Sequence, residues 1–197
     1  MSKRIAVFGG SFNPPGTHHQ EIALILSKWF DEVLVVPCGD RNDKPTTGST
    51  AATHRAKMAE LAFDNIAPNV RVDNFDLHGG MFTPMFKLQE RYAPLGEVWH
   101  IIGTDLVTGG AFGASDIQRY WKNGRELWTN LNFAICLRAG VPLEYHDLPP
   151  HRRVFLTGSD GASKTIRQRL QNRHSVAGLV SPEVETYIRK FELYRSV

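Results

Sequence analysis

The segment of residues 8–20 holds the residue types best suited to bind a phosphate chain: glycines, a serine and two histidines. It reads FGGSFNPPGTHHQ and matches neither the G-x-G-x-x-G pattern nor the P-loop pattern. Glycines let backbone N–H groups approach an anion, and the start of a helix adds the positive end of its dipole. His18 and His19 fall in the first turn of the helix expected next, where imidazoles could donate to the same anion. The segment indicates a polyphosphate site, although a plain glycine turn followed by solvated histidines fits the pattern equally well.

Apolar runs alternate with stretches of helical spacing along the whole chain, and these patterns predict the elements that must position the segment. Strands are predicted at Arg4–Phe8, Glu32–Pro37, Val70–Phe75, Glu97–Ile102, Phe133–Leu137 and Val154–Leu156. Helices are predicted at 18–30 with Trp29 on the apolar stripe, from a Thr50 cap through Ala62, from Pro84 as first helical residue, at 116–130, at 162–171 and from near Pro182.

This alternation predicts one α/β domain, residues 1–197, with a doubly wound, mostly parallel sheet and helices on both faces. Its last part, about 160–197, is helical. No repeat or linker indicates a second domain. Ligands of such sheets bind beyond the carboxyl ends of the strands. We therefore expect the chemistry in the loops that follow Phe8, Pro37, Ile102 and Leu156.

Composition excludes several classes of protein. Of 197 residues, 42% are hydrophobic and 22% charged, which is typical of a globular domain. Two isolated cysteines, Cys38 and Cys136, indicate neither a disulfide framework nor a zinc site. No apolar run suits a signal peptide or a membrane span, so a cytoplasmic protein with no membrane partner is expected.

Basic residues are concentrated towards the end of the chain. Residues 1–150 carry 14 basic and 16 acidic side chains, and residues 151–197 carry 9 and 4. Either a nucleic acid or a polyphosphate could bind such a region. Because the basic residues form no dense run and are not interleaved with aromatic residues, we expect a local phosphate clamp on a solvated helix face and no nucleic-acid partner.

The run Gly9-Gly10-Ser11-Phe12-Asn13-Pro14, followed by His19, resembles the signature of nucleotidyltransferases with a His-x-Gly-His motif. More narrowly, the chain resembles the nicotinate or nicotinamide mononucleotide adenylyltransferases over essentially its whole length. The further matching segments are Pro37–Gly39, Lys44-Pro45, His54-Arg55, Gly103–Asp105, Trp121, Arg138–Gly140, Ala162–Arg167 and Val180–Arg195.

The resemblance implies a Rossmann-like fold and a single in-line displacement. A phosphate oxygen of a pyridine mononucleotide would attack the α-phosphorus of ATP and release pyrophosphate, with Mg²⁺ accompanying ATP and no covalent intermediate. The partners implied are ATP and the mononucleotide, and a homo-oligomer stays open.

The same resemblance assigns roles to individual residues. His19, Lys44 and Arg167 would be catalytic, with Lys44 meeting the phosphate of the mononucleotide. Thr83 would bind the mononucleotide, Asp105 a hydroxyl of its ribose, and Trp121 would stack on its pyridine ring. The residues implied in ATP binding are Gly9, Gly10, Ser11, Phe12, His18, Ser163 and Lys164.

Some of these residues have structural interpretations that compete with these roles. Lys44 fits a solvated loop lysine, Trp121 a core aromatic and Asp105 a helix cap. For Arg55, inside a helix beside the sheet, we favour a structural role as the buttress of a loop.

The chain departs from the family pattern at three places. Gly16 stands where bacterial members have the first histidine of the motif, and His18 stands where they have its glycine. Met85 and Phe86 replace polar residues, and residues 106–120 form a longer, glycine-rich segment. These departures leave open the choice between nicotinate and nicotinamide, a related transferase with another acceptor of the cytidylyltransferase or pantetheine-phosphate type, and a nucleotide-binding regulator that has lost catalysis.

Overall fold

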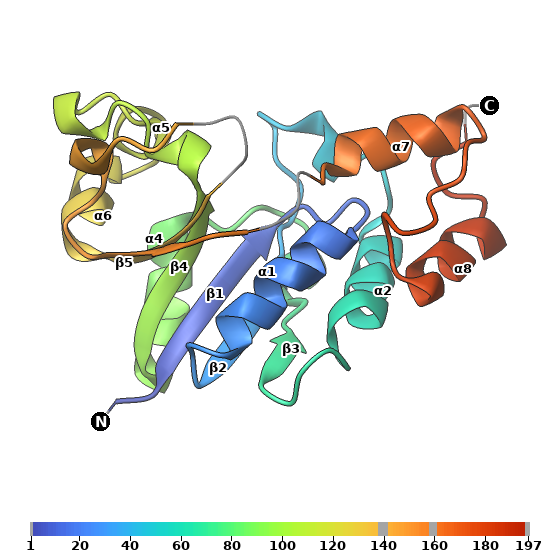
Figure 1. Cartoon of the computed structure of the whole chain (residues 1–197), viewed down its shortest axis with the longest axis horizontal. Helices are drawn as coiled ribbons and strands as arrows, with labels where there is room; N and C mark the ends of the chain where they lie inside the picture. The colour runs from blue at the N-terminus through green and yellow to red at the C-terminus, as the bar shows by residue number, and fades with distance from the viewer. Residues whose placement is uncertain (1, 138–141, 158–160, 196–197) are drawn as a thin grey trace.

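Six parallel strands form one sheet through the centre of the molecule, in the order β3-β2-β1-β4-β5-β6 (Figure 1). The computed structural model describes residues 2–137, 142–157 and 161–195. The strands are β1 (Arg4–Gly10), β2 (Glu32–Pro37), β3 (Val70–Val72), β4 (Glu97–Gly103), β5 (Asn132–Cys136) and β6 (Arg152–Phe155). The predicted doubly wound α/β fold is therefore confirmed, with a sheet that is wholly parallel among the described strands.

The strand order reverses between β1 and β4, which are neighbours in the sheet although two strands separate them in the chain. Their carboxyl ends diverge into loops that leave on opposite sides, and this opening is where ligands of such sheets bind. The loops after β1 and β4 carry the segments 11–16 and 104–115. The fold thus places the glycine-rich segment at the expected edge.

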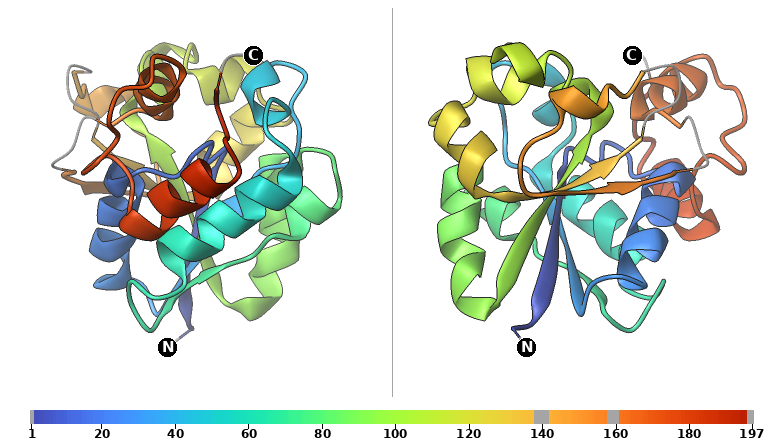
Figure 2. Two further views of the ribbon diagram at one scale, coloured as in Figure 1. Left: turned by 90° about the vertical axis from the view of Figure 1, so that its right-hand side faces the viewer. Right: turned by 60° about the vertical axis from the view of Figure 1, so that its left-hand side comes forward.

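Helices cover both faces of the sheet, as Figure 2 shows from two further sides. One face is packed by α1, α2, α7 and α8, and the other by α3, α4, α5 and α6. The helices are α1 (Thr17–Ser27), α2 (Ala52–Phe63), α3 (Phe75–His78), α4 (Met85–Tyr92), α5 (Asp116–Tyr120), α6 (Gly124–Asn130), α7 (Ser163–Gln171) and α8 (Pro182–Lys190). None of the helices in the described part of the chain is long and apolar enough to cross a membrane.

The apolar strand runs explain this layering, because every second residue of a strand faces the same layer of helices. Ala6 and Phe8 of β1 lie in the cluster beneath α1 and α2, whereas Ile5 and Val7 lie in the cluster beneath α4. The last helix, α8, packs on α2, where Nδ1 of His54 lies 3.0 Å from the hydroxyl oxygen of Tyr187.

The prediction of a single helix at 116–130 is wrong, because the chain forms two helices there, α5 and α6. Trp121 is extended and Asn123 has a left-handed φ of 61°, which breaks the helix. A Cβ on Gly124 would lie 1.8 Å from the carbonyl oxygen of Ile117, so glycine allows α6 to start against α5. Asparagine and glycine are the residues that most readily permit this turn.

Other boundaries differ for local reasons. Thr50 does not cap α2, whose N-cap is Ala51 with no side-chain hydrogen bond. Instead Thr50 is buried near the hydroxyl of Tyr194, close to the C-terminus. Pro84 is the N-cap of α4 and not its first helical residue.

The predicted third strand is shorter than its apolar pattern. β3 ends at Val72, because a carboxylate oxygen of Asp73 accepts the backbone N–H of Phe75 and turns the chain into α3. Trp29 lies beyond the end of α1 and is 52% exposed, so it does not belong to the buried stripe of that helix.

Candidate functional site

The loop after β1 is closed by the ring of Phe12, whose backbone has a φ of 41° and whose side chain is 1% exposed. The ring packs edge-on against Phe8 and Phe63, with ring centroids 5.3 Å away in each case. A Cβ on Gly10 would lie 2.9 Å from this ring, whereas nothing lies within 4 Å of a Cβ on Gly9. Gly10 is thus required for the packing of Phe12, whereas Gly9 leaves room for a ligand. Because the ring of Phe12 is buried, this residue could contact a ligand through its backbone only.

Asn13 has a fully buried side chain, and its side chain and backbone together join four segments of the chain, its own included. Its Nδ2 donates to the carbonyl oxygen of Thr46 at 2.7 Å and to Oγ of Ser49 at 3.2 Å. Its backbone oxygen accepts Nη1 of Arg167 at 2.6 Å, and its Oδ1 accepts the hydroxyl of Tyr194. The sequence pattern gives no signal for this role, because every partner lies more than 30 residues away.

His18 and His19 lie together at the start of α1, with ring centroids 3.8 Å apart and ring planes inclined by 39°. His18 is only 8% exposed, so the interpretation of this histidine as a solvated cap is wrong. Nδ1 of His19 accepts the backbone N–H of Gly16 at 3.0 Å. In the neutral ring the proton must then be on Nε2, which makes that nitrogen the donor.

The first turns of α7 are attached to the same loop. Oγ of Ser163 donates to the carbonyl oxygen of Pro14 at 2.8 Å, and Arg167 donates to that of Asn13. Lys164, next to Ser163, is exposed. The structure thus joins two of the residues expected on α7, Ser163 and Arg167, to the loop that precedes the histidine pair.

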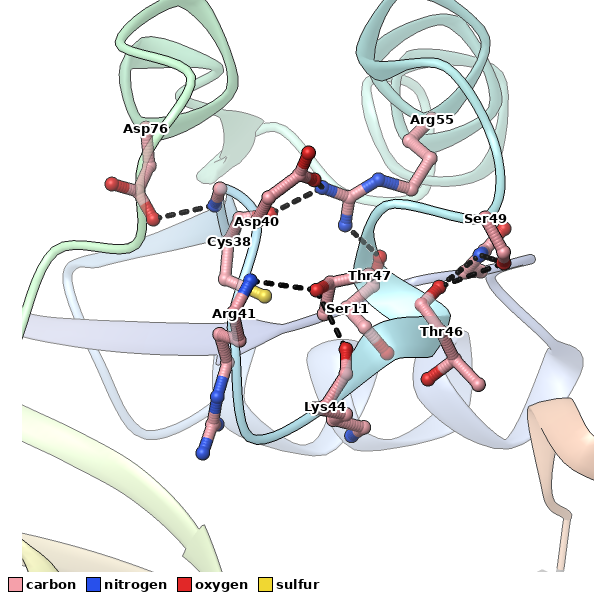
Figure 3. A network of polar contacts seen from close by, with 12 residues as sticks. Ser11, Cys38, Asp40, Arg41, Lys44, Thr46, Thr47, Ser49, Arg55 and Asp76 are labelled. Carbon is pink, nitrogen blue, oxygen red and sulfur yellow. Dashed lines mark hydrogen bonds and ion pairs between the residues drawn. The ribbon is translucent and has the colours of Figure 1, made fainter.

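Arg55 of α2 ties the ends of β1 and β2 together, as Figure 3 shows. Its fully buried guanidinium donates to the carbonyl oxygen of Ser11 at 2.9 Å and to that of Cys38, and lies 3.7 Å from a carboxylate oxygen of Asp40. The predicted structural role of Arg55 is confirmed. Burial raises the pKa of the Cys38 thiol, and the neighbouring Arg55 charge opposes the rise.

Lys44 lies at the tip of the loop after β2, just before the 3₁₀ turn Pro45–Thr47. The hydroxyl of Thr47 fixes the backbone there, because it donates to the carbonyl oxygen of Lys44 and accepts the N–H of Arg41, both at 2.8 Å (Figure 3). The Lys44 side chain is exposed and forms no ion pair within the described ranges. Its cation is therefore available to a ligand.

The three residues expected to bind the mononucleotide lie on separate loops. Thr83 follows Phe82, whose N–H donates to the carbonyl oxygen of Asp40 at 3.2 Å, so it lies beside the loop after β2. Asp105 is exposed in the 3₁₀ turn after β4. Trp121, at the end of α5, is half-buried against a hydrophobic cluster that includes side chains of α5 and α6. The structure thus arranges these residues around the edge without bringing them into one contact group.

The glycine-rich insertion is held by Asp147, a residue the sequence analysis missed. Its carboxylate accepts the backbone N–H of Gly109 at 2.7 Å and that of Ala111 at 3.1 Å. These two hydrogen bonds lower the pKa of Asp147. A Cβ on Gly110 would lie 2.5 Å from the ring of Trp128, so the insertion lies flat on the cluster beneath it. Spacing alone could not pair an acid with glycines almost 40 residues earlier.

Metal ligands are not gathered at the site: among the described residues no group of three or more His, Cys, Asp or Glu side chains could hold an ion. Mg²⁺ commonly binds through substrate phosphates and water and does not need such a cage. The matching segment Arg138–Gly140 lies outside the described residues.

The sequence is similar to those of known proteins. A family model described as cytidylyltransferase-like matches residues 7–177. A protein of Albidiferax ferrireducens named “Probable nicotinate-nucleotide adenylyltransferase” is 31% identical, with 98% of this chain and 99% of the relative covered. A protein of the same name from Oceanobacillus iheyensis is 28% identical, with 98% and 97% covered.

The fold is shared with a solved structure as well. The nicotinic acid mononucleotide adenylyltransferase of Plasmodium falciparum, complexed with NaAD, superimposes with a TM-score of 0.81 at 24% identity. The match covers 98% of this chain and 97% of that one. At this level of identity the likeness establishes the common architecture.

Proposed function

The chain belongs to the cytidylyltransferase-like family, and we propose that it transfers AMP from ATP to a pyridine mononucleotide, releasing pyrophosphate in a step of NAD biosynthesis. The observation that carries the proposal is the stacked pair of imidazoles at the start of α1, with the first turn of α7 beside it. This pair lies in a chain that aligns end to end with relatives named for that activity.

On the ATP side, the chain supplies donors for a triphosphate. Nε2–H of His19 points away from Gly16 and donates to a phosphate oxygen, and the imidazole of His18 lies against it. The N-terminus of α1 adds its partial positive charge, and Lys164 adds a full one. Ser163 and Arg167 hold α7 in place through Pro14 and Asn13, and Arg167 offers its remaining N–H donors to the same phosphates.

These donors act on charge that develops in the transition state. When an oxygen attacks the α-phosphorus in line, negative charge spreads over its equatorial oxygens and the departing pyrophosphate. Donors that are already fixed stabilise that charge without reorganising. His19 is fixed by its hydrogen bond to Gly16, so it has the required preorganisation.

On the acceptor side, the attacking phosphate is itself an anion and must approach another anion. Lys44 offers an exposed cation on a loop that Asn13 holds next to the loop after β1. Its charge offsets the repulsion between the two phosphates. Thr83, Asp105 and Trp121 would orient the ribose and the pyridine ring, with the exposed part of Trp121 as the stacking surface.

We propose that Mg²⁺ arrives as the complex with ATP. Since no group of three ligands exists among the described residues, the phosphates and water would supply most of its coordination. Bound in this way, the ion neutralises the phosphate chain. The two cysteines are free thiols, which suits the reducing cytoplasm we propose for this activity.

For the acceptor we favour nicotinate mononucleotide, because the curated relatives are named for nicotinate nucleotides. The test measures pyrophosphate release from MgATP with nicotinate mononucleotide, nicotinamide mononucleotide and phosphopantetheine, one at a time. The proposal expects release with a pyridine mononucleotide. Release with phosphopantetheine alone would identify a related transferase, and no release with any acceptor would identify a nucleotide-binding regulator.

A further inference from the structure

The ring of His18 lies in a slot between two glycines that are 145 positions apart in the sequence. A Cβ built on Gly16 would lie 2.6 Å from both Cε1 and Nδ1 of this ring. A Cβ built on Gly161 would lie 2.2 Å from Nδ1 and 2.3 Å from Cγ. Real Cβ atoms do not approach other atoms this closely. The slot therefore accepts His18 only while both neighbours lack a side chain.

Sterics, and not backbone conformation, require glycine at position 16. Gly16 has a φ of −111° and a ψ of 169°, an extended conformation that any residue adopts. The ring of His18 and a side chain on residue 16 would thus compete for the same space. Ile166 of α7 limits that space further, because its Cδ1 would be 3.0 Å from the same Cβ.

The sequence Gly16-Thr17-His18-His19 places a glycine and a histidine two positions apart, in the reverse of the order found in His-x-Gly-His. We propose that Gly16 and His18 are an exchanged pair: position 18 presents an imidazole in the space that a histidine at position 16 would fill. Gly16 and Gly161 are then positioning residues for His18. This proposal rests on the proposed function, because it makes His18 a second imidazole for the phosphate chain of ATP.

The ring of His18 lies where two helices begin. Gly161 comes two residues before α7 and Gly16 is the N-cap of α1, so the ring of His18 separates the starts of two helices. The centroid of the His19 ring lies 3.8 Å from that of His18. The ring of His18 thus lies against the residues that precede both helices.

The test is an exchange experiment on the full-length chain, with kcat and the KM for MgATP read from pyrophosphate release. His18→Gly is expected to lower kcat/KM for MgATP by about 10-fold or more, the size expected for a lost hydrogen bond to a charged group. Adding Gly16→His to that variant restores the imidazole from the other position. The double variant should recover to within about 3-fold of the native value if the two positions share one volume.

A second comparison detects the shared volume without relying on rescue. Gly16→Ala should lower kcat/KM by about 10-fold in the native background and by less than about 2-fold in His18→Gly, because no ring is left to displace. Gly79→Ala is the matched control, since its Cβ would meet atoms only at 3.6 Å, an ordinary contact. Circular dichroism and thermal melting verify that each variant is folded.

Equal losses from Gly16→Ala in both backgrounds, or a folded double variant no more active than His18→Gly, would overturn the proposal. If the native chain forms no product with any pyridine mononucleotide, the proposed function fails separately. The shared volume is then read by NMR, from the cross-relaxation between the His18 ring and the Gly16 Hα atoms. Its presence supports the packing, and its absence contradicts it.

Discussion

The two sides of the opening between β1 and β4 are held in place by different kinds of interaction. On the side of β1, two fully buried polar groups fix the loops. The side chain of Asn13 joins its own loop to residues 46–49 and to Tyr194, and the guanidinium of Arg55 joins the ends of β1 and β2. Such bonds are directional and costly to leave unmade. This side therefore presents one geometry, as nucleotide transfer requires.

On the side of β4, packing dominates. Residues 104–121 lie on a hydrophobic cluster to which Met85 and Phe86 also contribute, and Asp147 anchors them through hydrogen bonds to Gly109 and Ala111. Phe112 is 85% exposed, which indicates a surface with few constraints. Hydrophobic packing is not directional and tolerates substitution. The contrast suggests that the β1 side fixes the geometry of the reaction, whereas the β4 side determines which acceptor binds.

The largest effect should come from His19 on the polar side. His19→Ala is expected to lower kcat by at least about 100-fold, the loss seen for a single donor to a developing oxyanion. The measurement is pyrophosphate release at saturating substrates, with His78→Ala on α3 as a control histidine. A variant with native turnover would show that the reaction does not depend on the imidazole pair.

Arg55 tests whether buried polar bonds stabilise this side. Arg55→Met leaves the carbonyl groups of Ser11 and Cys38 without their donor, so the free energy of unfolding should fall by about 2 kcal/mol. Urea titration measures it, and Arg125→Met on the exposed face of α6 is the control. Equal stability of the two variants would contradict the assignment of Arg55 as the buttress.

Trp121 tests the packed side. Trp121→Ala should raise the KM for the pyridine mononucleotide by about 10-fold, because a stacked aromatic contributes on the order of 1–3 kcal/mol per base. The KM for MgATP should change little. Tyr120→Ala, a neighbouring aromatic residue that is 72% exposed, is the control. A Trp121 variant that changes only the KM for MgATP would reverse the assignment of the two sides.

His100 tests strand β4 itself, on the packed side. It is fully buried in β4, its Nε2 lies 2.8 Å from Oε1 of Gln89, and burial lowers its pKa to about 3. Because the unfolded chain binds the proton more readily, stability is complete above about pH 6.5 and is lost as pH falls towards 3. The unfolding free energy of the native chain should fall more steeply over this range than that of His100→Gln, by up to about 1.4 kcal/mol per pH unit. Parallel profiles would contradict the buried neutral histidine.

Local patterns in the sequence predicted much of this molecule. Apolar runs, together with the alternating segment Val70–Phe75, identified all six described strands, and the glycine-rich segment after β1 lies at the edge where ligands bind. Even the structural role of Arg55 followed from its place inside a helix beside the sheet.

Features that depend on distant partners were not predictable from spacing. Thr50 has the residue type of a helix cap but is buried near Tyr194, which only folding brings close. Asn13 and Asp147 owe their roles to groups more than 30 residues away. The burial of His18 depends on Gly161, which no local window contains.

The central claim is tested most directly by following the α-phosphorus of ATP. With ATP labelled at that atom and nicotinate mononucleotide as acceptor, we expect the label in a dinucleotide product, unlabelled pyrophosphate, and no label on the protein. Label that stays in ATP, or that becomes attached to the protein, would contradict a direct transfer at the His18–His19 pair.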